Sequence, residues 1–304
     1  MENKVTSDAN TANQQRVPRV VAFVCEGEFQ EHLAARLNQE FQLVGVVIQQ
    51  GQIATSQNLL QRVRRYLHPL QLAQYLIARL TLPYFAAKAR RRFEQNFAPL
   101  LKFDNSTKTI RVDNINNPSV EQFIKDLAPE IVCVNGTQLI REPLLSSINS
   151  LPMGALNLHT GLSPYSRGGN CNLFMLLANK PELIGATIHR LDSGVDSGGI
   201  VTTLRPSFAS DDPYELLEAR VFVEGIEALV DAVKLVAKGG VRVTSQWEEG
   251  ELFLVRTGYR YSPYLKVRAN HMVWRGVLRD YLLNKDKRDE QIVTIPLQSK
   301  ASND

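Results

Sequence analysis

Short apolar runs rich in valine and isoleucine recur along the chain, and segments with helical periodicity separate them. Residues 19–25 form a continuous apolar run, as expected for a strand buried on both faces. Residues 28–40 then place Leu33 and Leu37 at helical spacing, before a second apolar run at 41–48. This strand–helix–strand order predicts an α/β fold that opens with parallel strands.

The same reasoning extends over the rest of the chain. It predicts further strands at 107–112, 130–134, 154–159, 185–191 and 199–204, and further helices at 119–127, 142–149, 172–178, 212–238 and 263–283.

Residues 58–101 interrupt the alternation. They have a helical composition, and basic residues flank the apolar stretch 67–87. Polar side chains and Pro83 break up that stretch, whereas a membrane span needs about 20 largely uninterrupted apolar residues. We therefore expect a basic helical insert. It forms a lid over the functional site, a surface helix that contacts anionic lipid, or a solvated hairpin packed on the core.

Composition divides the remainder into three parts. Residues 1–17 are polar and lack the apolar core of a signal peptide, which predicts a disordered tail. Residues 18–210 form the main domain and contain the insert. Residues 211–304 form a C-terminal helix and a small extension, with a hairpin around Glu249 and Gly250 and a basic aromatic helix.

The overall composition is ordinary for a globular protein. The 304 residues are 44% hydrophobic and 22% charged, enough to bury a sizeable core, and the net charge is +4. That charge is compatible with anionic ligands but does not require them. Cys25, Cys133 and Cys171 occur singly, which indicates a reducing compartment and a cytoplasmic location.

The richest stretch in functional groups runs from Gly154 to Asp196. Asn157 and His159 are two residues apart on a predicted strand, so their side chains point to the same face. Asp196 ends a loop after another predicted strand and can close on the same crevice. An amide that donates to an oxyanion, an imidazole that moves a proton and a carboxylate that orients it suit an acyl-type transfer.

Each of these residues also has an ordinary explanation by itself. A single asparagine often caps a helix, a single histidine is usually a structural group, and an aspartate before Ser-Gly-Gly is often a turn residue. The other histidines, His32, His68, His189 and His271, do not cluster with cysteine or acidic residues at metal-binding spacing. We therefore expect no metal site. A supporting role is left open for His189, which lies on the predicted strand before the loop that contains Asp192 and Asp196.

Several ordered motifs surround the three polar residues. They are Leu127 to Gly136 (LAPEIVCVNG), Gly154 to His159 (GALNLH), Leu162, Pro164, the pair Arg167 and Gly168, Gly185 to His189 (GATIH), and Asp192 to Ile200. With these motifs the chain resembles the folate-dependent formyltransferases, which include glycinamide ribonucleotide transformylase, methionyl-tRNA formyltransferase and the amino-sugar N-formyltransferases. The resemblance covers roughly residues 19–210. It implies a Rossmann-like, mostly parallel sheet flanked by helices, here with a helical insert and a small C-terminal extension.

The resemblance also implies roles for individual residues. Asn157, His159 and Asp196 match the family's catalytic asparagine, histidine and aspartate. The family's cosubstrate is 10-formyltetrahydrofolate, and its pterin lies against two loops. In this sequence those loops are matched by Asn135, Gly136, Thr137, Gln138, Leu139 and Ile140, and by Asp192, Ser193 and Val195. The expected acceptor-binding residues are Gly27, Tyr165 and Arg167.

The sequence departs from the family where the acceptor would bind. The usual His-Pro-Ser-Leu-Leu-Pro is replaced by residues 159–164 (HTGLSP), and Ser166 stands before Arg167 in place of an aromatic residue. The first strand is followed by Glu26, Gly27 and Glu28, where two carboxylates would repel a phosphate. Glycinamide ribonucleotide is therefore disfavoured, and the basic C-terminus does not resemble the second domain of the tRNA enzyme.

A small-molecule amine is accordingly the expected acceptor, with an amino sugar, nucleotide-linked or not, as the leading class. A lipid-linked or natural-product amine, hydrolysis of the cosubstrate, and a catalytically silent module that binds folate or a nucleotide remain alternatives. Nucleic acid is not an expected partner. A homodimer and contact of residues 58–101 with a membrane surface are left open.

Overall fold

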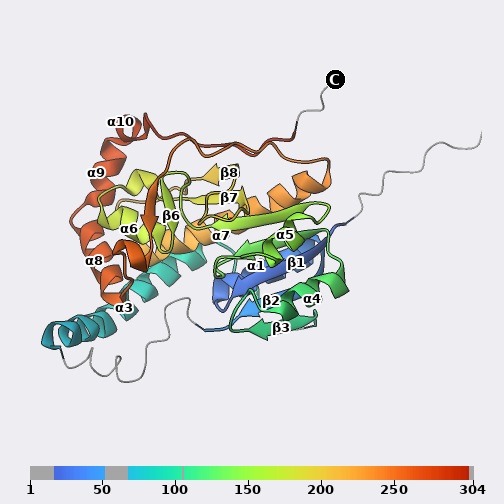
Figure 1. The fold of residues 1–304 in the computed structure, drawn as a ribbon. Helices are drawn as coiled ribbons and strands as arrows, with labels where there is room; N and C mark the ends of the chain where they lie inside the picture. The colour runs from blue at the N-terminus through green and yellow to red at the C-terminus, as the bar shows by residue number, and fades with distance from the viewer. Residues whose placement is uncertain (1–16, 52–67, 105, 301–304) are drawn as a thin grey trace, which may run out of the picture.

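The computed structural model describes residues 17–51, 68–104 and 106–300 (Figure 1). The predicted tail, except its last residue, and residues 58–67 of the predicted insert lie outside this part. The predicted α/β fold with a mostly parallel sheet flanked by helices is confirmed. The seven strands of the sheet are β1 (Arg19–Cys25), β2 (Gln42–Gln49), β3 (Thr109–Val112), β4 (Ile131–Asn135), β5 (Gly154–His159), β7 (Ala186–Arg190) and β8 (Ile200–Leu204).

The strand order is β3-β2-β1-β4-β5-β7-β8. Strands β1 to β5 pair in parallel, whereas β7 is antiparallel to both β5 and β8. This change of direction beside β5 matters for function, because the chain that leaves β7 has to turn back before β8. The turn places the acidic loop 191–199 next to the last parallel strand.

Helices cover the two faces of the sheet with separate apolar cores. One core joins the sheet to α1 (Glu28–Glu40) and α7 (Tyr214–Ala237), and the other joins it to α4 (Pro118–Leu127) and α5 (Leu144–Asn149). Along β5, Leu156 and Leu158 point into the first core and Ala155 into the second. Asn157 and His159 therefore continue the face of Ala155, beyond the end of the second core.

The helix α7 lies very close to the sheet at Gly225. A Cβ atom there would come within 2.7 Å of the Leu158 side chain. The first core continues from α7 into α8 (Pro263–Trp274) and α9 (Val277–Leu283). The domain division at residue 210 remains a prediction.

Two predicted C-terminal elements differ in the structure. The expected helix over 263–283 is divided at Gly276, whose φ of +95° lies in the left-handed region that interrupts a helix. The hairpin expected around Gly250 is wrong. The strand β9 (Glu251–Phe253) instead pairs in parallel with β6 (Ser166–Gly168), far away in the sequence, so no local pattern announces the partner. The remaining elements are α6 (Cys171–Leu177), α10 (Lys285–Asp289) and the short 3-10 helices Pro181–Leu183 and Val255–Thr257.

The described part of the insert is a single long helix, α3 (Pro69–Asn96), which continues through Pro83. It packs against α7 and α8 through a face that contains Ala78 and Ala89. An ion-pair network also holds it, because Arg92 donates to the buried carboxylate of Asp212 at 2.7 Å. Within the described residues, no helix has an apolar stretch long enough to cross a bilayer.

Candidate active site

The site begins on β5, where Asn157 and His159 lie on the same face as the sequence predicts. Both side chains are buried. They are in register with β7, because Asn157 pairs with His189 and His159 with Thr187. Four polar side chains therefore lie on one face of two adjacent strands, close to the end of the sheet's parallel half.

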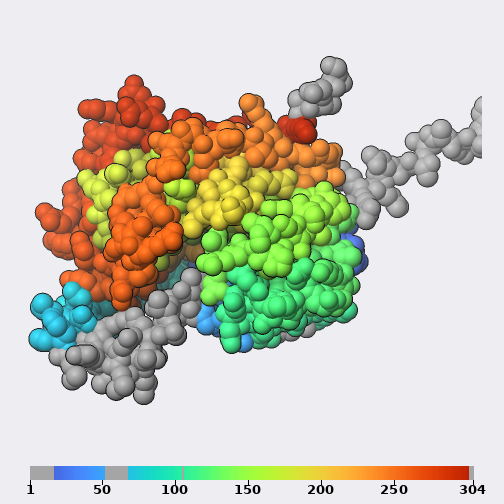
Figure 2. Space-filling model, in the orientation of Figure 1, coloured from blue at the N-terminus to red at the C-terminus, as the bar shows by residue number. Residues whose placement is uncertain are grey.

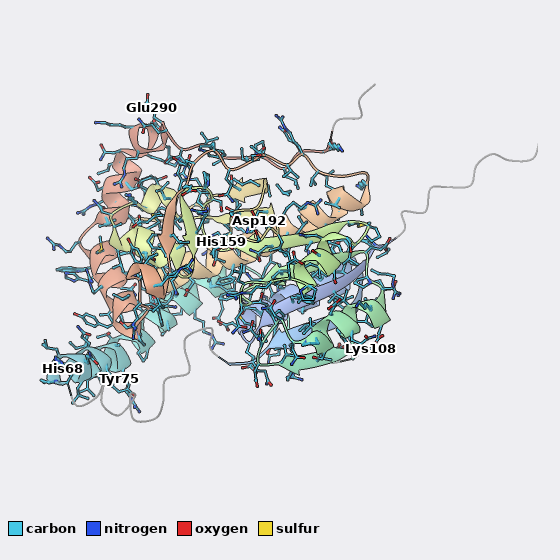
Figure 3. The ribbon with its side chains drawn as sticks, viewed as in Figure 1. His68, Tyr75, Lys108, His159, Asp192 and Glu290 are labelled. Atoms are coloured by element: carbon cyan, nitrogen blue, oxygen red, sulfur yellow. The ribbon has the colours of Figure 1, made fainter. Side chains whose placement is uncertain are left out.

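Asp196 joins this group from the loop between β7 and β8. Its Oδ2 atom lies 3.4 Å from Nδ1 of His159, and its Oδ1 atom lies 3.4 Å from Nδ2 of Asn157. The three residues expected to be catalytic are thus brought together in space. Figure 3 shows His159 near the centre of the molecule, in the same region as Asp192 at the start of the acidic loop.

The backbone around Asp196 fixes its carboxylate. Asp196 has a φ of +47°, in the left-handed region that aspartate tolerates better than most residues. The backbone N–H of Gly168 donates to Oδ2 at 2.9 Å, and Nε2 of Gln246 donates to the Asp196 carbonyl at 2.8 Å. Strand β6 and the segment before β9 therefore both help to hold the acidic loop over β5.

The electrostatics of the pair follow from burial and charge. Burial by itself would raise the pKa of Asp196, but a protonated His159, the neighbouring His189 and the Gly168 N–H outweigh it and hold that pKa well below its usual range. Burial lowers the pKa of His159, and the carboxylate of Asp196 offsets this only in part. The result is an ionised aspartate beside an imidazole that gives up its proton readily.

Both ring nitrogens of His159 face acceptors. Nδ1 faces the Asp196 carboxylate, and Nε2 lies 3.2 Å from the carbonyl oxygen of Ser166. A neutral imidazole has only one N–H to donate, whereas an imidazolium would satisfy both contacts. These two acceptors offset part of the cost of burying a protonated ring, which suits a group that accepts a proton and then returns it.

His189 belongs to the same cluster. Its Nδ1 atom lies 2.6 Å from the carbonyl of Arg190 and must donate to it, so Nε2 of a neutral ring accepts from Nδ2 of Asn157 at 2.9 Å. His189 therefore orients the Asn157 amide. The sequence left only a possible supporting role for His189. Its place on the predicted strand that leads into the loop 191–199 was the one indication of that role.

Thr187 ties the loop after β5 to the sheet. Its hydroxyl donates to the carbonyl of Gly161 and accepts from the backbone N–H of Ser163, both at 2.8 Å. This loop, residues 160–164, is where the sequence departs from the family pattern. It is nevertheless firmly attached beside His159.

The residues expected to contact folate follow β4 and β7. Asn135 is buried and fully engaged, since it accepts from Gln30 and donates to the Leu158 carbonyl, both at 2.8 Å. Ile140 is buried in the second core, and Leu139 is exposed. The remaining residues lie in the two loops. After β4 these are Gly136, with a φ of +74°, Thr137, and Gln138, whose backbone N–H donates to the Gln49 side chain. After β7, Asp192, Ser193 and Val195 form a turn.

The three expected acceptor residues are dispersed. Nε of Arg167 on β6 is buried and has no hydrogen-bond partner among the described residues. The Tyr165 hydroxyl is engaged, because it accepts from the backbone N–H of Val293 at 2.7 Å. Gly27 lies beyond β1, where it helps to line a cavity of about 220 Å³.

Within the described residues, no three His, Cys, Asp or Glu side chains form a group that could hold a metal ion. The fold and the cluster instead define an α/β protein with a buried Asn–His–Asp site at the end of a central strand. A family model described as "Formyl transferase" matches residues 80–233, just over half of the chain. The chain belongs to the formyl transferase family.

Sequence relatives agree with this membership. The chain is 25% identical over 190 residues to a methionyl-tRNA formyltransferase of Caldanaerobacter subterraneus subsp. tengcongensis, covering 61% of this chain and 58% of that protein. It is 28% identical over 134 residues to a methionyl-tRNA formyltransferase of Kosmotoga olearia, covering 44% of this chain and 42% of that protein. The chain thus spans about half the length of these relatives.

Among solved structures, the fold is similar to a phosphoribosylglycinamide formyltransferase from Anaplasma phagocytophilum. The TM-score is 0.51 and the sequence identity 17%, over 79% of this chain and 98% of that one. At this identity the likeness concerns the fold alone.

Proposed function

We propose that this protein is an N-formyltransferase that moves a formyl group from 10-formyltetrahydrofolate to a primary amine of a small molecule. The observation that carries the proposal is the contact of Asp196 with both Asn157 and His159, in a chain of the formyl transferase family. The cosubstrate supplies an activated formyl group. The protein has to position the amine, take up its proton and stabilise the charge on the formyl oxygen.

His159 is the residue that we assign to proton transfer. The attacking amine must lose a proton, and an imidazole with a lowered pKa is largely neutral near pH 7 and can accept it. The imidazolium formed then lies 3.4 Å from the Asp196 carboxylate, which stabilises it. As the tetrahedral adduct collapses, the bond from the formyl carbon to N10 of the cosubstrate breaks, and His159 returns its proton to that nitrogen.

Asn157 is the donor that we assign to the formyl oxygen. One hydrogen of its Nδ2 is directed at His189, at 2.9 Å. The other faces Asp196 at 3.4 Å, a long distance for a hydrogen bond, so a developing oxyanion competes well for it. Such a donor is worth roughly 100- to 1000-fold in rate.

The cosubstrate would lie between the loops after β4 and β7. We assign its pterin to residues 135–140 and 192–196 from the family resemblance. The buried, unpaired Nε of Arg167 fits a bound substrate, because a buried donor without an acceptor is costly and a substrate oxygen would satisfy it.

The cavity beside Gly27 is the acceptor pocket that we propose. Glu26, Glu31, Phe103 and Arg111 also line it. Carboxylates accept the hydroxyl hydrogens of a sugar, and an aromatic ring offers a face for stacking. Two carboxylates repel a phosphate, and Arg111 offsets part of that repulsion. These features favour an amino sugar as the acceptor.

Hydrogen bonds connect this cavity to the catalytic strand. Gln30, which lines the cavity, donates to Asn135, and Asn135 donates to the carbonyl of Leu158, between the two β5 catalytic residues. Two hydrogen bonds in series thus link the proposed acceptor pocket to the strand that carries Asn157 and His159.

The decisive experiment is transfer in vitro. The protein is incubated with 10-formyltetrahydrofolate and a panel of amino sugars, free and nucleotide-linked, with methionyl-tRNA and glycinamide ribonucleotide as further acceptors. Mass spectrometry then detects the added formyl group, with Asn157→Ala as the control. We expect formylation of an amino sugar only. Formylation of methionyl-tRNA alone would overturn the acceptor assignment.

Two other results would overturn the reaction itself. Release of formate without an acceptor, at the rate of transfer, would indicate a hydrolase. Tight folate binding with no turnover on any amine would indicate a binding module.

A further inference from the structure

The N-terminal half of α3 carries large apolar side chains that nothing in the described structure covers. Leu80 is 78% exposed and Tyr84 69% exposed, and Leu76 and Ile77 are both exposed as well. Figure 3 shows His68 and Tyr75 at the end of α3 that projects from the body of the molecule. Exposed apolar side chains gathered on one element indicate a binding surface.

Helical geometry places these side chains on one face. Ala73, Leu76, Ile77, Leu80 and Tyr84 follow the spacing i, i+3, i+4, i+7 and i+11, which forms a single stripe. The buried residues Ala78 and Ala89 mark the face that packs on the protein, and at 100° per residue the stripe lies roughly on the opposite side. α3 is therefore apolar on its packed face and also on its solvent face.

The neighbouring helix α8, on which α3 packs, carries a further exposed aromatic side chain close to Tyr84. Trp274 at the end of α8 is 79% exposed. Together with Tyr84 and Phe85 it lines a cavity of about 290 Å³ at the junction of the two helices. Figure 2 shows the end of α3 (cyan) beneath the orange C-terminal segments at the lower left edge of the molecule. We call the stripe on α3 together with Trp274 the α3–α8 surface.

The charges around the α3–α8 surface are positive. Arg91, Arg275 and Arg279 are exposed, and within the described ranges none of them forms an ion pair. Arg279 also lines the cavity with Lys88. Asp211, which also lines the cavity, is already bound to Lys88 and Arg92.

We propose that the α3–α8 surface binds to an anionic lipid membrane, with α3 lying in the plane of the interface. Leucine and isoleucine would enter the acyl boundary, tyrosine and tryptophan favour the headgroup level, and arginine attracts anionic lipids. No described helix can cross a bilayer, so the contact is peripheral. This inference does not depend on the proposed reaction.

A second copy of the chain is the other occupant that this surface could have. In a symmetric dimer the same patch meets itself, so the arginines around it would face one another. Like charges brought together at an interface disfavour that association, whereas anionic lipid neutralises them. The observed charges therefore favour the membrane.

Vesicle flotation tests the proposal directly. Mixed phosphatidylcholine–phosphatidylglycerol vesicles are compared with pure phosphatidylcholine vesicles. We expect the protein to float with the mixed vesicles only, and less so at high salt, because salt screens the charge attraction. Equal recovery with both vesicle types, or none with either, would overturn the proposal.

A variant pair locates the contact. Combining Leu80→Gln with Tyr84→Ser should lower the apparent affinity for mixed vesicles by about tenfold or more, because two apolar side chains that would be buried in the membrane are lost. Leu283→Gln on α9 is the matched control, because Leu283 is equally exposed (80%) but lies outside the stripe. Unchanged thermal melting and an unchanged circular dichroism spectrum confirm that both proteins are folded.

Two further measurements complete the test. In a Trp247→Phe background, the fluorescence of Trp274 should shift to the blue when mixed vesicles are added, and an unchanged spectrum would contradict the proposal.

Sedimentation should give a monomer for the wild type in the absence of vesicles. A dimer that the Leu80 and Tyr84 substitutions dissociate would assign the surface to self-association and overturn the membrane assignment.

Discussion

Nδ1 of His159 lies 3.4 Å from Oδ2 of Asp196, and this contact joins β5 to the loop between β7 and β8. It exists because β7 runs antiparallel to β5, so the chain leaving β7 folds back over the catalytic strand. The Gly168 N–H and the Gln246 side chain then hold the loop in place. The proposed chemistry depends on this closure.

Removing any member of the cluster should abolish most of the transfer activity. We expect Asn157→Ala, His159→Gln and Asp196→Asn each to lower kcat by about 100- to 1000-fold without unfolding the protein, because each acts on the developing charge. Steady-state kinetics and circular dichroism measure the two effects. Asn270→Ala, at a buried asparagine bonded to Glu215, is the matched control and should retain turnover. Near-normal kcat in any one of the three would refute its assignment.

His189 should act through Asn157. Replacing it with phenylalanine deprives the buried Asn157 amide of this partner, a cost of about 1–3 kcal/mol, which corresponds to roughly a 5- to 150-fold loss in kcat. The KM for the acceptor should stay nearly constant. His32→Gln provides the comparison, since His32 is also buried but accepts from Leu101 outside the site. A loss in His189→Phe no larger than in His32→Gln would show a merely structural role.

The titration of His159 should respond to Asp196 with a definite sign. Burial lowers the pKa of His159 and the Asp196 carboxylate raises it, so Asp196→Asn should lower the pKa further. NMR titration of the imidazole resonances, assigned with His159→Gln, measures the shift. A pKa that rises in the variant would contradict the electrostatic role of Asp196.

Asp196 should also contribute to acid sensitivity. Its folded pKa lies below its unfolded value, so the unfolded chain binds more protons as the pH falls below about 4. The stabilisation is therefore present above that pH and is lost as the pH falls. Denaturant unfolding of wild type and Asp196→Asn between neutral and acid pH should show a difference in unfolding free energy that shrinks on acidification. A difference independent of pH would exclude this linkage.

The attachment of α3 should depend on Asp212. This buried carboxylate accepts from Arg92 at 2.7 Å and from Arg220 at 2.6 Å. Asp212→Ala should lower the free energy of unfolding by about 1–3 kcal/mol, because two guanidinium groups lose a charged acceptor. Chemical denaturation measures the change. Asp231→Ala on the exposed surface of α7 should change it by less than about 0.5 kcal/mol.

The sequence was sufficient for those elements whose signal is local. The valine-rich run of β1 and the periodic helix that became α7 are visible in the order of residues, because each buries its own regular face. The spacing of Asn157 and His159 likewise fixed their common side of the strand. By contrast, the expected hairpin near Gly250 is wrong, since β9 pairs with β6, 85 residues earlier in the chain, and no local pattern can indicate that register.

By itself, then, the sequence determined the α/β class, the strand that carries Asn157 and His159, and the resemblance to the formyltransferases. Only the tertiary structure decided that Asp196 closes on His159, that His189 orients Asn157, and that Tyr165 is tied to Val293 rather than free for a substrate. It also decided that the apolar stripe of α3 faces solvent. The physical reason is that periodicity encodes which side of an element is apolar, whereas the partner of that side depends on packing between segments distant in the chain.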